Sequence, residues 1–136
     1  MAIEKEQLKR MYLTMRRIRV FETEVNRLYA ETKIFGFGHL YAGEEAIATA
    51  VCECLHKDDY ITSTHRGHGH VIAKGGDTRK MMAELFARES GYCKGKGGSM
   101  HIANLDLGIV GANGIVGAGQ PLSVGVALSI QMRKTD

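Results

Sequence analysis

Residues 60–70 have the sequence YITSTHRGHGH. The first five are rich in β-branched and aromatic side chains, which is typical of a buried strand. Glycines and histidines dominate residues 65–70, so we expect a loop where this strand ends. In α/β proteins, ligands bind at the C-terminal ends of strands. This stretch therefore predicts a strand followed by a functional loop.

Two helices are predicted before this strand. From about Glu4 to Glu31, apolar residues recur at steps of three and four, which indicates a long amphipathic helix. Its buried stripe is expected to consist of Leu8, Met11, Met15, Ile18, Phe21, Val25 and Leu28. After a glycine-rich loop at residues 36–43, a second helix is predicted from about Glu44 to Leu55. Its expected inner face consists of Ala46, Ile47, Ala50, Val51 and Cys54.

Helices and glycine-rich loops alternate after the strand. A short helix is expected from Val71 to Lys74, and another, capped by Asp77 or Thr78, ends near Arg88. The expected inner face of the second consists of Met81, Met82, Leu85 and Phe86. Residues 91–119 hold nine of the 17 glycines, and such a long glycine-rich connection indicates a functional region.

A last helix is predicted from Gln120, with Pro121 in its first turn and a face of Val124, Ala127, Leu128 and Met132. Helices arranged around one predicted strand are typical of an α/β sheet. This chain would be a mostly helical piece of such a sheet domain. The alternative is a small, mainly helical domain.

The composition excludes several classes of protein. Hydrophobic residues make up 44% of the chain and charged residues 24%, as in ordinary globular proteins. The net charge of +3 is too small to indicate a nucleic-acid partner. No apolar run approaches the roughly 18 residues of a membrane helix, and the first ten residues lack the apolar core of a secretory signal. Three cysteines, an odd number, argue against a disulfide framework and favour a cytoplasmic location.

Five of the six histidines lie in the glycine-rich loops. His65, His68 and His70 have a spacing that could suit zinc, but Arg66 lies among them and favours an anion such as phosphate. Residues 117–122 lack the third glycine of a dinucleotide-binding fingerprint, and residues 91–96 lack the spacing of a phosphate-binding P-loop. The residues by themselves predict a phosphorylated ligand beside exposed backbone, and zinc binding is the alternative.

Four motifs in this order and spacing resemble the alpha subunits of the thiamine-diphosphate-dependent 2-oxo-acid and acetoin dehydrogenases. They are residues 39–46 (HLYAGEEA), 65–69 (HRGHG), 95–101 (GKGGSMH) and 113–117 (NGIVG). The resemblance covers nearly the whole chain. It implies the N-terminal portion of a thiamine-diphosphate-binding α/β domain with a parallel sheet.

The resemblance also implies site residues. His65 and Arg66 would contact the diphosphate of the cofactor, although many family members have tyrosine at the first position. The backbone of Gly114 and Val116 would meet the aminopyrimidine ring. The expected substrate pocket includes Phe37, and the expected catalytic residues are His39, which would orient the substrate, His68 and His101.

The magnesium motif of the family, Gly-Asp-Gly followed by a distant asparagine, is expected beyond Asp136. Residues 1–136 are therefore expected to be an incomplete domain that binds no metal and is inactive alone. The resemblance implies a heterotetramer of two alpha and two beta subunits, and a lipoyl-bearing acyltransferase that receives the two-carbon unit.

The amino-acid sequence at residues 100–103 and 111–113 resembles that of acetoin-type members of the family more than that of pyruvate-type members. We therefore predict cleavage of acetoin, with pyruvate as the alternative substrate. Two alternatives from other classes are a helical module that dimerises through its first helix and a zinc hydrolase.

Overall fold

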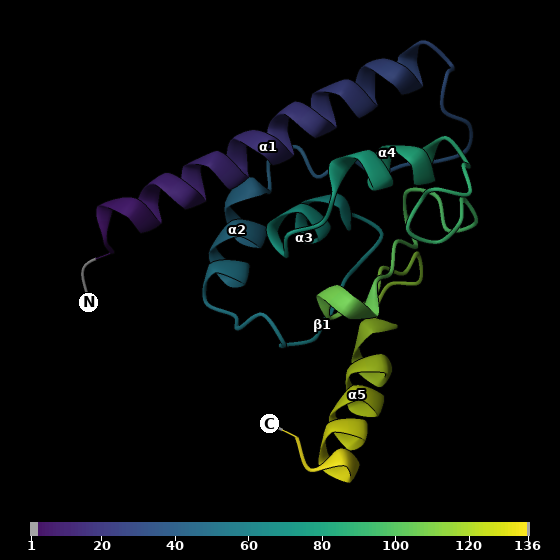
Figure 1. Cartoon of the computed structure of the whole chain (residues 1–136). Helices are drawn as coiled ribbons and strands as arrows, with labels where there is room; N and C mark the ends of the chain where they lie inside the picture. The colour runs from purple at the N-terminus through teal and green to yellow at the C-terminus, as the bar shows by residue number, and fades with distance from the viewer. Residues whose placement is uncertain (1–2, 136) are drawn as a thin grey trace.

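The computed structural model describes residues 3–135, of which about half are helical. In chain order the elements are α1 (Lys5–Ala30), α2 (Glu45–Glu53), β1 (Ile61–Thr62), α3 (His68–Ala73), α4 (Thr78–Leu85), the 3-10 helix η1 (Leu105–Leu107), β2 (Ile109–Gly111) and α5 (Gly119–Arg133). Helix α1 runs along one side of the molecule, with α2 and α3 packed beneath it, and α5 extends from the opposite end (Figure 1).

Helix α1 confirms the predicted amphipathic helix. Its C-terminal half buries Ile18, Phe21, Val25 and Leu28, four members of the predicted stripe, in the main hydrophobic core. Leu8, at the N-terminal end of the stripe, is half exposed because the helix extends past the elements that cover it. The periodicity therefore identified the helix and its buried face, whereas the length of the buried stripe depends on α2 and α3.

The small sheet has a strand that the sequence did not predict. β1 and β2 pair in parallel, with Ile61 opposite Ile109 and Thr62 opposite Gly111, and the register shifts between the two pairs. Strand β2 was expected to be part of the glycine-rich loop region, because three residues among glycines carry no periodic signal. Its pairing with β1 makes it a strand. The parallel pair supports the α/β prediction over the mainly helical alternative.

The inner face predicted for α2 is wrong. The helix buries Glu45, Ala48 and Thr49, whereas Ile47 and Val51 are 59% and 54% exposed. In this orientation, ion pairs link α1 to both ends of α2. Arg10 pairs with Glu53, and Arg19 pairs with the buried Glu45. The hydrogen bond from Arg19 lowers the pKa of Glu45 to about 2 despite its burial, so this carboxylate stays charged against α1.

The helices after β1 follow the predicted order with shifted ends. α3 begins at His68, three residues before the predicted start. The Asp77 side chain caps α4 by accepting a hydrogen bond from the backbone nitrogen of Arg79, as predicted. Met81 and Leu85 of α4 are buried in the core, and Met82 and Phe86 pack against it. The predicted inner face of α4 is therefore confirmed.

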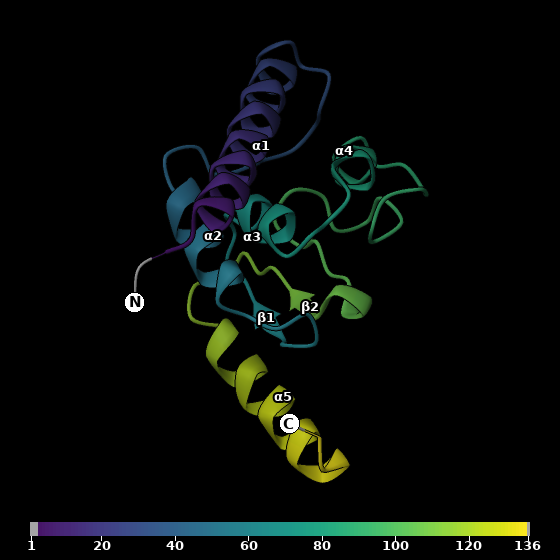
Figure 2. The ribbon, with the colours of Figure 1, turned by 60° about the vertical axis from the view of Figure 1, so that its left-hand side comes forward.

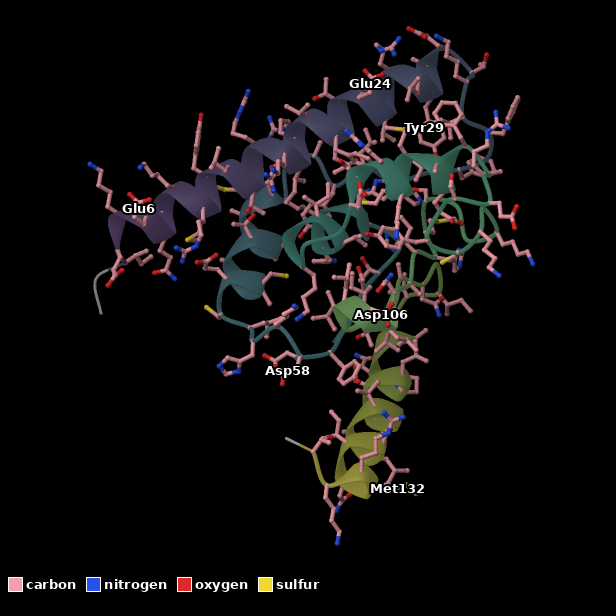
Figure 3. All side chains as sticks on the ribbon, in the orientation of Figure 1. Glu6, Glu24, Tyr29, Asp58, Asp106 and Met132 are labelled. Carbon is pink, nitrogen blue, oxygen red and sulfur yellow. The ribbon has the colours of Figure 1, made fainter. Side chains whose placement is uncertain are left out.

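Helix α5 extends from below the two strands, away from the other helices (Figure 2). None of its residues is buried, and its predicted apolar face, including Val124 and Met132, is mostly exposed. Figure 3 shows Met132 at the end farthest from the other helices. Near the start of α5, the Ser123 hydroxyl lies 3.2 Å from that of Thr62, so α5 begins directly beside β1.

Candidate functional site

A cavity of about 470 Å³ lies at the C-terminal end of β1. Its walls come from the end of that strand and from the segment that leads into α5. The lining residues are Thr62, Ser63, Thr64, His65, Ile115, Val116, Gly117, Gly119, Gln120 and Ser123. Ligand pockets in proteins commonly have volumes of about 300–1,000 Å³. The cavity therefore lies where α/β proteins bind ligands, and its volume suits a small molecule.

The two walls of this cavity differ in character. The strand wall consists of Thr62, Ser63, Thr64 and His65, residue types whose hydroxyl and imidazole groups can bind a polar or anionic group. The Thr62 hydroxyl also contacts Ser123, and that of Ser63 contacts His70. On the other wall Ile115 and Val116 are 73% and 84% exposed, and Gly117 turns the chain with a φ of +88°. Exposed apolar side chains beside bare backbone suit a flat ring. Two predicted cofactor residues, His65 and Val116, line the same cavity.

The segment that contains Phe37 and His39 lies against the loop that contains His65 and Arg66. The rings of His39 and His65 meet edge to face, with centroids 4.9 Å apart. The Arg66 guanidinium donates a hydrogen bond of 2.6 Å to the carbonyl oxygen of Leu40. Phe37, two residues before His39, is almost fully exposed. The structure thus brings four predicted residues into one region, although Arg66 does not line the cavity.

His68 lies in the interior, away from the cavity. Its Nδ1 atom lies 2.8 Å from Oε1 of Glu22, and its Nε2 atom lies 2.9 Å from the Ser99 hydroxyl. His68 and Glu22 are fully buried, and the second oxygen of Glu22 accepts a hydrogen bond from the backbone nitrogen of Tyr41. Both ring nitrogens are therefore occupied. This position favours a structural role for His68, in place of the predicted catalytic one.

His101 is exposed, and its ring lies beside Gly114. A Cβ atom on Gly114 would lie 3.7 Å from the His101 Nε2 atom. The loop before His101 is anchored by Cys93, whose sulfur lies 3.3 Å from the His101 carbonyl oxygen. The structure therefore places His101, a predicted catalytic residue, next to Gly114, a predicted cofactor residue.

Glu84 organises the glycine-rich loop that leads to His101. Its fully buried carboxylate accepts four backbone hydrogen bonds, from Cys93, Gly95, Gly97 and Gly98, at 2.7 to 3.1 Å. Burial would raise the pKa of Glu84, but these four N–H groups together lower it, so the carboxylate is charged at neutral pH. Sequence analysis missed this residue.

A signal for Glu84 was present in the sequence. Glu84 lies three residues after Met81 and directly before Leu85, so it falls on the predicted buried face of α4. An acidic residue on a buried helix face needs hydrogen-bond donors, and the following loop is rich in glycine amides.

The three histidines with zinc-like spacing have separate partners. His65 contacts His39, His68 contacts Glu22 and Ser99, and His70 contacts Tyr41 and Ser63, so each histidine faces a different group. Within residues 3–135, no group of three or more histidine, cysteine or acidic side chains is arranged to hold a metal ion. The spacing in sequence therefore does not produce a shared ligand set.

In the described part of the chain, no helix combines the length and apolar character needed to cross a membrane.

Comparison with known proteins gives consistent matches. The family described as dehydrogenase E1 component matches residues 13–136. The alpha subunit of acetoin:2,6-dichlorophenolindophenol oxidoreductase from Bacillus subtilis is 56% identical over 135 residues, covering 99% of this chain and 40% of the relative. The subunit of the same name from Cupriavidus necator is 51% identical over 131 residues, covering 96% of this chain and 39% of the relative.

More distant relatives carry a different name. The alpha subunit of the pyruvate dehydrogenase E1 component from Zymomonas mobilis is 43% identical over 132 residues, covering 96% of this chain and 37% of the relative. The chain thus spans about two fifths of the length of these three relatives.

Proposed function

The chain belongs to the dehydrogenase E1 component family, and we propose that it forms part of the alpha subunit of a thiamine-diphosphate-dependent enzyme that cleaves acetoin. The observation that carries this proposal is the cavity at the end of β1, which joins His65 to the exposed Val116 ridge. In this proposal the chain contributes one part of the cofactor site, and the remaining parts come from residues beyond Asp136 and from a partner subunit.

The chemistry of the cavity fits thiamine diphosphate. One wall offers hydroxyl and imidazole groups for a diphosphate, and the other offers Ile115 and Val116 for an apolar ring. His65 and Arg66 would hold the diphosphate, and the backbone of Gly114 and Val116 would meet the aminopyrimidine ring. When bound, thiamine diphosphate supplies a nucleophilic carbon for the substrate carbonyl and a ring that accepts the electron pair released on cleavage. Magnesium would bind through residues beyond Asp136.

The chain's own residues would orient the substrate. His39 is exposed and lies in edge contact with His65, so it can hold a proton at the substrate oxygen next to the cofactor site. Phe37, in the same segment, would cover the apolar part of the substrate. His101, beside Gly114, is the second candidate for proton transfer. We assign His68 a structural role: from α3 it contacts Glu22 of α1 and Ser99 of the 97–101 loop, and so links the three segments.

The preference for acetoin over pyruvate is supported by the relatives. Those at 56% and 51% identity carry names that refer to acetoin, whereas those named pyruvate dehydrogenase are 37% to 43% identical. We further propose a cytoplasmic heterotetramer of two alpha and two beta subunits that passes its two-carbon unit to a lipoyl-bearing acyltransferase.

The direct test is an assay of the full-length subunit together with its beta partner, with acetoin and pyruvate in parallel. We expect a higher kcat/KM for acetoin, and a higher value for pyruvate would reverse the substrate assignment. Binding of thiamine diphosphate, measured by calorimetry, tests the site separately. His65→Ala should weaken binding roughly tenfold through loss of one hydrogen bond to a charged group. The matched control is His56→Ala, because the His56 side chain is exposed and lies outside the cavity.

A further inference from the structure

Three buried or half-buried side chains form a hydrogen-bonded row behind the strand wall of the cavity. The Tyr41 hydroxyl lies 3.2 Å from Nε2 of His70, and Nδ1 of His70 lies 2.7 Å from the Ser63 hydroxyl. Tyr41 precedes α2, His70 belongs to α3, and Ser63 follows β1. Of the three, Ser63 lines the cavity. The row therefore connects the interior of the chain with the proposed ligand.

The position of the Tyr41 proton decides the direction of this row, that is, which group of each hydrogen-bonded pair is the donor. Tyr41 is almost fully buried, and among residues 3–135 its hydroxyl has one hydrogen-bond acceptor, the Nε2 atom of His70. Burial, reinforced by the charge of Glu44, raises the pKa of Tyr41 to about 12, so the phenol keeps its proton at neutral pH. A buried hydroxyl proton without an acceptor is strongly unfavourable. Tyr41 therefore donates to His70.

The tautomer of His70 then determines whether Ser63 accepts or donates the second hydrogen bond. Burial lowers the pKa of His70, although the charge of Glu44 opposes this, so the ring is neutral at neutral pH. A neutral imidazole has one N–H group and one acceptor nitrogen. Because Nε2 accepts from Tyr41, the proton lies on Nδ1 and is donated to the Ser63 oxygen.

The Ser63 proton is then left without an acceptor in the described part of the chain. The one partner of its hydroxyl there is His70, which already uses the oxygen as an acceptor. Ser63 is itself buried, and it is one of the residues that line the cavity. We propose that Ser63 donates a hydrogen bond to a phosphoryl oxygen of the cofactor, and that Tyr41 and His70 hold it as a donor. This inference rests on the proposed function for the identity of the ligand.

The direction of the row can be measured without any ligand. In the full-length chain, ¹⁵N NMR of the imidazole nitrogens distinguishes the two neutral tautomers. We expect His70 to carry its proton on Nδ1. A proton on Nε2 would overturn the inference, because Ser63 would then donate to His70 and have no proton for a ligand. Tyr41→Phe, which removes the donor but retains the ring, should weaken the preference for the Nδ1 tautomer. An unchanged tautomer ratio would remove Tyr41 from the row.

The ligand is tested by binding, in the full-length subunit with its beta partner and magnesium. Ser63→Ala should raise the Kd for thiamine diphosphate roughly tenfold, since a hydrogen bond to a charged oxygen is lost. Ser63→Thr keeps the hydroxyl and should stay within about twofold of the wild type on the same grounds. Inorganic diphosphate should lose the same factor as the cofactor. A loss for thiamine diphosphate alone would exclude a phosphoryl acceptor.

The outcomes separate this inference from the proposed function. If the wild type binds thiamine diphosphate and Ser63→Ala binds it equally well, the Ser63 assignment is wrong and the proposed function stands. If the wild type binds no thiamine diphosphate, the proposed function is wrong, the cofactor assignment of Ser63 is wrong with it, and the His70 tautomer still decides the direction of the row.

Discussion

The carboxylate of Glu84 provides the sharpest test of how the glycine-rich loop is held in place. Each oxygen accepts two backbone hydrogen bonds, Oε2 from Cys93 and Gly95, and Oε1 from Gly97 and Gly98. Glu84→Gln has almost the same shape, but the new NH₂ group can only donate. One pair of backbone N–H groups would then face another donor. The substitution therefore removes two acceptor contacts without leaving a cavity.

The magnitude follows from those two contacts. A hydrogen bond to a charged group contributes about 1.5 kcal/mol at the lower end of its range, so losing two should lower the free energy of unfolding by about 3 kcal/mol. Urea denaturation at neutral pH measures this difference. The matched control is Glu89→Gln, since Glu89 is exposed on the same segment and should change stability by no more than about 0.5 kcal/mol. Equal stability of Glu84→Gln and the control would refute the role of the carboxylate.

The pH dependence gives a second check on Glu84. Because its pKa in the folded state is lowered from 4.5, the unfolded chain binds its proton first as the pH falls. The stabilisation is therefore complete above about pH 4.5 and is lost as the pH falls through the lower pKa of the folded state. The stability difference between wild type and Glu84→Gln should stay constant from neutral pH to about pH 5 and shrink below that. A difference that grows in acid would contradict this assignment.

Substitutions at three other residues test their contacts. His68→Ala should lower the free energy of unfolding by about 1–3 kcal/mol or more, because it leaves the buried Glu22 carboxyl without its partner; a change below about 0.5 kcal/mol in urea denaturation would contradict the structural role. Arg66→Ala should weaken binding of thiamine diphosphate to the assembled enzyme roughly tenfold and release the segment at Leu40, and unchanged affinity in calorimetry would remove Arg66 from the site. Asp77→Ala should cost about 1 kcal/mol through loss of the α4 cap, whereas Asp77→Asn should retain most of it.

Features with a local physical cause could be predicted from the sequence. The spacing of Ile18, Phe21 and Val25 identified the buried face of α1, and Asp77 identified the start of α4. The run at residues 60–64 identified β1, and the loop after it contains His65, which lines the cavity. The motifs carried the family assignment, which the family match over residues 13–136 confirms. The site roles of His65, Arg66, Gly114 and Val116 stay predictions.

Burial of polar groups could not be predicted in the same way, because it depends on partners that are distant in sequence. Glu22 and His68 are 46 residues apart, so the spacing of the histidines alone could not distinguish a loop histidine from an interior one. The buried face of α2 depends on its packing against α1 and α3, and strand β2 exists because it pairs with β1.

The sequence by itself thus determined where the five α-helices of residues 3–135 lie, roughly where the first strand lies, and which family the chain resembles, since periodicity, capping and motif order are properties of neighbouring residues. β1 is shorter than predicted, Ile61–Thr62 in place of residues 60–64. Only the tertiary structure decided that His65 and Val116 share one cavity, that His68 is interior, and that Glu84 holds the glycine loop. The physical reason is that a buried charge or hydroxyl is stable only where distant segments supply its hydrogen bonds.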